Sequence, residues 1–147
     1  MKAEIEIVPA ALDDLEAITR LEANSFPAPW RREYFESELR AAGRYNRVAK
    51  VPSGVIGYLF AMYYLDEMHI NKIAIEELQR RRGLATAMMR ECIDFAKSKS
   101  IVLLSLEVRQ TNGGAQDFYK TLDFAPAYVR KNYYPDGEPA VVMVAKL

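Results

Sequence analysis

The sequence is poor in the residues that form disulfides and zinc sites. Its 147 residues include one cysteine, Cys92, and one histidine, His69. A single thiol cannot form an internal disulfide, and no cysteine and histidine cluster supplies the ligands of a structural zinc ion. These absences favour a reduced, cytoplasmic location and predict no bound metal.

Membrane segments and a net charge are also absent. No apolar run reaches the roughly 18 residues of a membrane-spanning helix. Residues 1–7 alternate charged and apolar side chains, which is typical of a first strand and not of a signal peptide. Twenty basic and twenty acidic residues cancel, so the chain lacks the basic field of a nucleic-acid-binding domain. We therefore expect neither nucleic acid nor a membrane as a partner.

What is present is the pattern of one α/β domain over residues 1–147, a length that fits a single core. Turn residues separate seven strand-like segments, at 5–9, 45–50, 55–65, 68–76, 101–108, 125–133 and 139–146. Apolar residues at helical spacing predict four helices, at 13–25, 29–41, 84–98 and 114–122. This order combines an antiparallel part with one central parallel crossover.

The most informative segment is a basic turn, Arg80-Arg81-Arg82-Gly83-Leu84-Ala85, between an apolar strand and an amphipathic helix. Backbone N–H groups in the first turn of a helix have no partners within the helix, and the helix dipole adds partial positive charge there. Gly83 allows a phosphate to approach closely, and the arginines supply forked, charged donors. The segment is neither a Walker A loop nor a three-glycine dinucleotide turn. It predicts a site for a phosphate-bearing small molecule, with a solvated helix start as the alternative.

Two residues further along the chain are candidates for acid–base chemistry. Alternation in the strand at 101–108 places Glu107 on the same face as Ser105 and Arg109, near the strand end where α/β sheets bind ligands. Tyr119 lies on the helix that follows. The alternatives are a Glu107 that is solvated or paired with Arg109, and a Tyr119 that only packs.

These segments together resemble the GNAT acetyltransferases, whose pyrophosphate loop has the pattern Arg/Gln-x-x-Gly-x-Gly/Ala. The basic turn matches that loop, and it is accompanied in the family's order by Ile73-Ala74-Ile75, Leu106-Glu107-Val108-Arg109, Asn112 and Phe118-Tyr119. The resemblance covers nearly the whole chain. It implies an α/β (α+β type) GNAT fold, with a mixed central sheet of six to seven strands flanked by about four helices.

A narrower resemblance is to the ribosomal-protein-alanine N-acetyltransferase family, which acetylates the N-terminal alanine of a small-subunit ribosomal protein. It is carried by Pro29-Trp30 with Phe35, and most specifically by Arg130-Lys131-Asn132-Tyr133-Tyr134-Pro135. Lys72 stands where these enzymes commonly have asparagine. The resemblance implies a protein N-terminus as the acceptor and acetyl-CoA (coenzyme A) as the cofactor.

The resemblance also implies a role for each matching residue. Glu107 is the expected general base and Tyr119 the expected general acid. The expected cofactor-binding residues are Ile73, Ala74, Ile75, Arg81, Arg82, Gly83, Leu84, Ala85, Thr86 and Asn112. The expected walls of the peptide groove are Trp30, Phe35, Tyr133 and Tyr134, although Trp30 and Phe35 fit a core role equally well. Transfer is expected to be direct, so we interpret Cys92 as a core residue and not as a nucleophile.

Two other functions fit the same cofactor loop. One is a GNAT enzyme that acetylates lysine side chains or a small amine, and the other is a non-catalytic acyl-CoA-binding module. The presence of both Glu107 and Tyr119 argues against the second. Two side features stay open: acids at Glu22, Asp66 and Glu67 that attract a cationic N-terminus or are merely solvated, and a His69 that contacts the acceptor or simply packs. The oligomeric state does not follow from the sequence.

Overall fold

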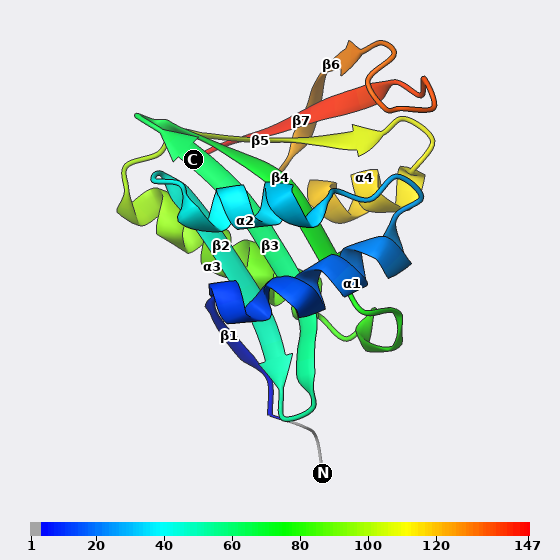
Figure 1. Cartoon of the computed structure of the whole chain (residues 1–147). Helices are drawn as coiled ribbons and strands as arrows, with labels where there is room; N and C mark the ends of the chain where they lie inside the picture. Colours follow the sequence, from blue (N-terminus) through cyan, green and yellow to red (C-terminus); the bar gives the residue numbers. More distant parts are fainter. Residues whose placement is uncertain (1–3) are drawn as a thin grey trace.

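The computed structural model describes residues 4–147, so residues 1–3 of the alternating N-terminus lie outside it. Within this range, seven strands form one sheet in the order β1-β2-β3-β4-β5-β7-β6, flanked by four α-helices (Figure 1). The strands are β1 (Glu6–Pro9), β2 (Arg44–Val51), β3 (Gly54–Tyr64), β4 (Glu67–Ile75), β5 (Leu103–Arg109), β6 (Ala125–Arg130) and β7 (Ala140–Lys146). The helices are α1 (Leu15–Ser25), α2 (Arg32–Arg40), α3 (Leu84–Ser98) and α4 (Gly113–Lys120).

This order of helices and strands confirms the predicted fold, with shifts at the ends of elements. The predicted second helix begins at Arg32 instead of Pro29, because the Trp30 N–H is bonded to the Glu22 carboxylate and Arg31 is extended. The fifth strand begins at Leu103, since the Val102 N–H donates to the carbonyl of Asp66, in the turn between β3 and β4.

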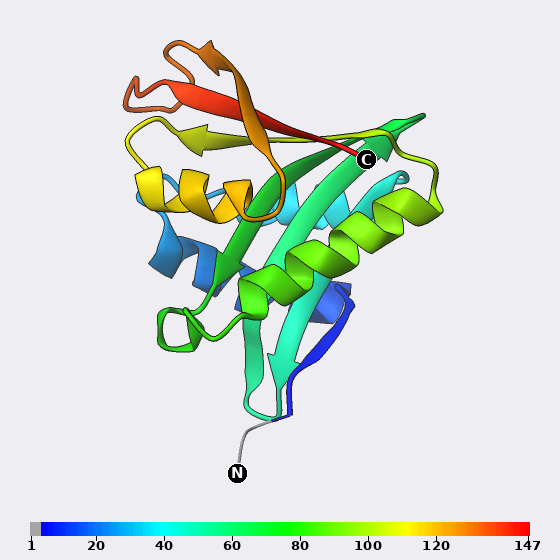
Figure 2. The same ribbon diagram turned by 180° about the vertical axis from the view of Figure 1, so that it is seen from behind.

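The sheet opens where β4 and β5 separate. These two parallel strands pair only from Glu67–Ile70 to Leu103–Leu106. Beyond that point β5 turns away to pair with β7, while β4 continues along β3 (Figures 1 and 2). The last residues of β4 are therefore not hydrogen-bonded to β5, and a gap in the sheet lies beside them. Helix α3 lies along one side of this gap and α1 along the other.

A β-bulge in β4 decides which side chains face this gap. Phe60 pairs with Lys72 but Ala61 pairs with Ile70, so Asn71 is the extra residue. The extra residue reverses the in–out alternation of the strand. As a result Lys72 shares a face with Phe60 and Ala74, on the side that α1 and α2 cover. Without the bulge Lys72 would point to the α3 side, with Ile70.

Each face of the sheet has its own core. The α3 side buries a large cluster that includes the expected inward stripe of α3, with Leu84, Met88, Cys92 and Ala96 buried and Phe95 partly buried. The α1–α2 side buries a smaller, aromatic cluster that includes Phe35, Tyr58 and Phe60. The core position of Cys92 is confirmed: burial raises the pKa of its thiol to about 12. No helix in residues 4–147 is long and apolar enough to cross a membrane.

Candidate active site

The basic turn adopts the geometry of an anion site. Arg81 and Gly83 both have left-handed backbone conformations, with φ of 64° and 82°. Gly83 is the N-cap of α3 and offers no side-chain cap, so the first N–H groups of the helix keep no partner inside it. A Cβ at Gly83 would meet no protein atom within 4 Å, so the space beside this backbone is open. Among residues 4–147, no carboxylate lies within ion-pair distance of Arg81 or Arg82.

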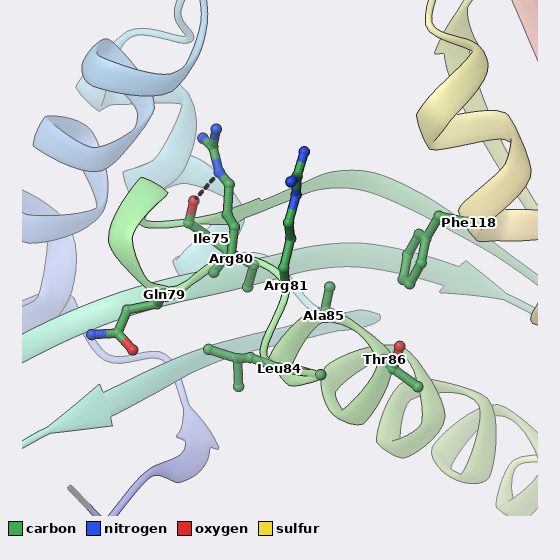
Figure 3. A pocket seen from close by; sticks show the side chains of 9 residues that line it. Ile75, Gln79, Arg80, Arg81, Leu84, Ala85, Thr86 and Phe118 are labelled. Carbon is green, nitrogen blue, oxygen red and sulfur yellow. Dashed lines mark hydrogen bonds between the residues drawn. The ribbon is translucent and has the colours of Figure 1, made fainter. Parts of the chain in front are cut away.

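A cavity of about 350 Å³ lies against this turn. Figure 3 shows Arg81 rising from the turn, Ala85 and Thr86 on the first turn of α3, and Phe118 of α4 across the cavity. Arg80 is used differently, because its Nε donates to the Ile75 carbonyl at 2.9 Å and so fastens the turn to the end of β4. The structure thus brings together six of the expected cofactor residues, namely Ile75, Arg81, Gly83, Leu84, Ala85 and Thr86.

The other expected cofactor residues fall into two groups. Ile73 and Ala74 line an adjoining cavity of about 270 Å³, which extends through the gap beyond the paired part of β4 and β5. Arg82 and Asn112 line neither cavity. Asn112 caps α4 instead, accepting a hydrogen bond from the Ala115 N–H at 3.1 Å.

Tyr119 lines the same second cavity as Ile73 and Ala74. Its ring packs against Phe118 and Phe124. Burial, followed by the effect of Tyr134, raises the pKa of Tyr119 to about 12, so the hydroxyl keeps its proton at neutral pH. The hydroxyl is therefore present in its protonated form as a hydrogen-bond donor beside this cavity.

Glu107 lies on the opposite side of the gap, in a chain of polar groups. Its carboxylate is 2.6 Å from Nε2 of His69, and Nδ1 of His69 is 2.7 Å from the Ser105 hydroxyl. With a proton on Nε2, the imidazole donates to Glu107 and accepts from Ser105. Arg130 Nη1 lies 3.8 Å from the other carboxylate oxygen. The suggested pairing of Glu107 with Arg109 is therefore wrong: Arg109 binds Asp136 and Glu138 at 2.9 and 2.8 Å.

The segment after β6 lies beside Glu107. Arg130 stacks over the Tyr133 ring, Arg109 lies 4.1 Å from the centre of the Tyr134 ring, and the two tyrosines contact each other edge to face. Burial is the largest cause of the raised pKa of both phenols; Glu107 adds to it at Tyr133, and Tyr133 and then Glu107 add to it at Tyr134. Two of the expected peptide-groove residues are thus close to the expected base.

The other two expected groove residues, Phe35 and Trp30, belong to the core on the α1–α2 face of the sheet. Phe35 is fully buried in the aromatic core, so a peptide cannot touch it. Trp30 is half-buried and packs on Phe35, with 5.3 Å between ring centres. Of the loop between α1 and α2, it is Phe26 that lines the second cavity.

The interpretation of Glu22 as a surface acid is wrong. Its side chain has no exposed area and accepts hydrogen bonds from the Tyr58 hydroxyl and the Trp30 N–H. The Lys72 ammonium is the third group that binds the Glu22 carboxylate, with 3.0 Å between Nζ and Oε2. Asp66 and Glu67 are exposed, but they lie at the end of β4 remote from Ile73–Ile75 and line neither cavity.

Comparison with known proteins decides the family. The acetyltransferase (GNAT) family model matches residues 15–124. The chain belongs to the GNAT acetyltransferase family. It is 33% identical to a putative ribosomal protein bS18-alanine N-acetyltransferase of Bacillus subtilis, covering 97% of this chain and 96% of the relative. It is 32% identical to the ribosomal protein bS18-alanine N-acetyltransferase of Escherichia coli, covering 88% and 89%.

Solved structures agree with this GNAT assignment. The crystal structure of the ribosomal-protein-S18-alanine N-acetyltransferase from Escherichia coli matches with a TM-score of 0.91 at 29% identity, covering 97% of this chain and 94% of that chain. Ard1 from Thermoplasma volcanium matches with a TM-score of 0.92 at 25% identity, covering 97% of both. The predicted family, fold and enzyme class are confirmed.

Several residues of this GNAT site were not among the predicted ones. Gln79, Phe118 and Phe26 line the two cavities, and His69 holds Glu107. Phe118 had a signal, since it adjoins Tyr119 in the matched pattern. Phe26 had none, and for His69 the sequence suggests only an acceptor contact or a packed residue, because the contacts of both depend on neighbours distant in the sequence. Within residues 4–147 no three His, Cys, Asp or Glu side chains are grouped for a metal ion.

Proposed function

We propose that this GNAT enzyme transfers the acetyl group of acetyl-CoA to the α-amino group of a protein N-terminus, the expected acceptor being the N-terminal alanine of a ribosomal protein. The observation that carries the proposal is the Glu107 carboxylate, held between His69 and Arg130 beside Tyr133. The relatives named as ribosomal protein bS18-alanine N-acetyltransferases support the choice of acceptor.

The proposed cofactor site is the cavity beside the basic turn. Open N–H groups at the start of α3 and the charge of Arg81 suit the pyrophosphate of coenzyme A, and Arg82, which does not line the cavity, adds positive charge to the same turn. The thioester then lies in the second cavity, where a backbone N–H of Ile73–Ile75 polarises its carbonyl. That backbone is available because β4 leaves β5 before these residues.

Proton removal from the acceptor is assigned to Glu107. A peptide α-amino group has a pKa of about 7.7–8.0 and is mostly protonated at neutral pH, so it loses a proton before its lone pair attacks the thioester carbon. Glu107 takes this proton, directly or through a water. His69 fixes the carboxylate by a hydrogen bond, and Ser105 fixes the imidazole.

Collapse of the tetrahedral intermediate breaks the carbon–sulfur bond and leaves a coenzyme A thiolate. Tyr119 is the proposed general acid, the donor of the proton that the thiolate takes up. The Tyr119 hydroxyl is protonated at neutral pH and lines the cavity proposed for the thioester, so it can donate a hydrogen bond to the leaving sulfur and pass on its proton as solvent restores it. The buried thiol of Cys92 has no part in this direct transfer.

A peptide panel tests the proposal. The protein is incubated with acetyl-CoA and peptides that differ in their first residue, alongside free lysine and polyamines, and the acetylated atom is located by mass spectrometry. We expect acetyl on the α-amino group, with alanine among the best first residues. Acetylation of small amines alone would instead favour the second candidate function. A cytoplasmic place of action and a single domain over residues 1–147 stay predictions.

A further inference from the structure

A buried ion pair lies beneath the loop that joins α1 to α2, residues 26–31. Glu22 is fully buried, and only 17% of the Lys72 side chain is exposed. The three groups that bind the Glu22 carboxylate come from three segments: the Tyr58 hydroxyl from β3, the Lys72 ammonium from β4 and the Trp30 N–H from the loop. Burial of a charged pair is costly unless its groups find partners, and here the Glu22 carboxylate accepts two hydrogen bonds besides its pairing with Lys72.

The Lys72 ammonium also contacts two aromatic rings of the loop. It lies 3.9 Å from the centre of the Phe26 ring and 5.4 Å from the centre of the Trp30 ring, both within the range of a cation–π contact. Phe26 and Trp30 therefore both contact the same cation, and Glu22 also accepts a hydrogen bond from the main chain of Trp30. The β-bulge at Asn71 puts Lys72 on this face of the sheet.

The loop is part of the site. Phe26 lines the second cavity together with Ile73, Ala74 and Tyr119, and it enters from the face that also carries His69 and Glu107. A movement of Phe26 changes the width of this cavity on the side of the α1–α2 loop. Neither Glu22 nor Lys72 lines either cavity, so both act through the loop.

We infer that Lys72, paired with Glu22, is a positioning residue that holds the 26–31 loop as the acceptor-side wall of the cavity and thereby sets acceptor affinity. The effect on acceptor affinity rests on the proposed function. The attachment of the loop to Lys72 does not rest on it.

The test compares Lys72→Met with a matched control, Lys50→Met. Lys50 also pairs with a buried carboxylate, Asp14 at 2.7 Å, but that pair joins β2 to the turn before α1 and not to the loop. Trp30 is the only tryptophan of the chain, so its fluorescence reports on the loop without any assay of activity. Glu22→Gln/Lys72→Met is measured as well, because it removes both charges and leaves no unpaired carboxylate if the single variant is too unstable.

For Lys72→Met, or for the double variant, we expect a red-shifted Trp30 emission that acrylamide quenches more strongly. We expect KM for the acceptor to rise about tenfold, the factor that corresponds to 1.4 kcal/mol, while KM for acetyl-CoA stays unchanged. Lys50→Met should change none of these. Unchanged fluorescence in a folded variant would overturn the attachment of the loop. Altered fluorescence with an unchanged acceptor KM would overturn its role as a wall. A wild-type protein that acetylates no peptide would refute the proposed function, and the loop attachment would still be judged by Trp30.

Discussion

The cofactor side and the proposed acceptor side of this site are held in different ways. On the cofactor side, the turn before α3 presents main-chain N–H groups, and its shape comes from left-handed conformations at Arg81 and Gly83. On the acceptor side, two loops are held by side-chain ion pairs. Glu22 with Lys72 fixes residues 26–31, and Arg109 with Glu138 fixes the segment between β6 and β7.

This difference explains why one side is easier to recognise. A main-chain anion site is formed by consecutive residues, so a short pattern describes it. An ion pair that fixes a loop joins residues from distant elements, so no short pattern contains it.

The largest effect is expected at the junction of the two sides, from Glu107→Gln. The amide keeps the shape of the side chain but cannot accept the acceptor's proton. We expect kcat/KM for peptide acetylation to fall roughly 10²- to 10⁴-fold, the usual contribution of a general base. The Kd for coenzyme A, measured by calorimetry, should not change. Acetylation at the wild-type rate would remove Glu107 from the mechanism.

A smaller effect, confined to the cofactor side, is expected from Gly83→Val. A β-branched residue at φ of 82° is strained by about 1–3 kcal/mol, which displaces the first turn of α3. We expect KM for acetyl-CoA to rise about tenfold, since 1.4 kcal/mol corresponds to that factor, with little change for the acceptor. Gly113→Ala is the matched control, because this glycine has open space and no left-handed backbone. An effect on the acceptor alone would contradict the division into two sides.

The converse effect is expected from Arg109→Met, which removes the cation between Asp136, Glu138 and the Tyr134 ring. The segment that carries Tyr133 and Tyr134 should loosen, and KM for the acceptor should rise about three- to tenfold while KM for acetyl-CoA stays constant. Steady-state kinetics with each substrate varied in turn measures the two values. Arg44→Met, which breaks the Arg44–Glu38 pair away from both cavities, should leave both unchanged.

The smallest expected effect is on the thermal stability of the protein at acidic pH. Hydrogen bonds from Thr111 and Arg109 lower the pKa of Glu138 from 4.5 to about 2. A lowered folded-state pKa means that the stabilisation is complete above pH 4.5 and is lost as the pH falls towards 2. The wild-type Tm should therefore fall more between pH 5 and 2 than the Tm of Glu138→Gln, by calorimetry. Equal falls would show that Glu138 adds no pH-dependent stability.

Local patterns predicted the elements and one face of the site. Helical spacing of Leu84, Met88 and Cys92 predicted the buried stripe of α3, and alternation placed Glu107 on the same face as Ser105. The same alternation suggested the wrong partner for Glu107. Its partner His69 comes from β4, and the parallel register that sets His69 opposite Ser105 forms only when two strands meet.

The sequence by itself determined the order of helices and strands, the basic turn before α3 and the resemblance to the family, because each depends on neighbours along the chain. Only the tertiary structure decided that Glu22 is buried, that Phe35 is core and that Lys72 faces the loop. The bulge at Asn71 and the packing of α1 on the sheet made these assignments. The physical reason is that burial and charge pairing depend on which surfaces meet, and a periodic pattern does not specify which polar residue finds which partner.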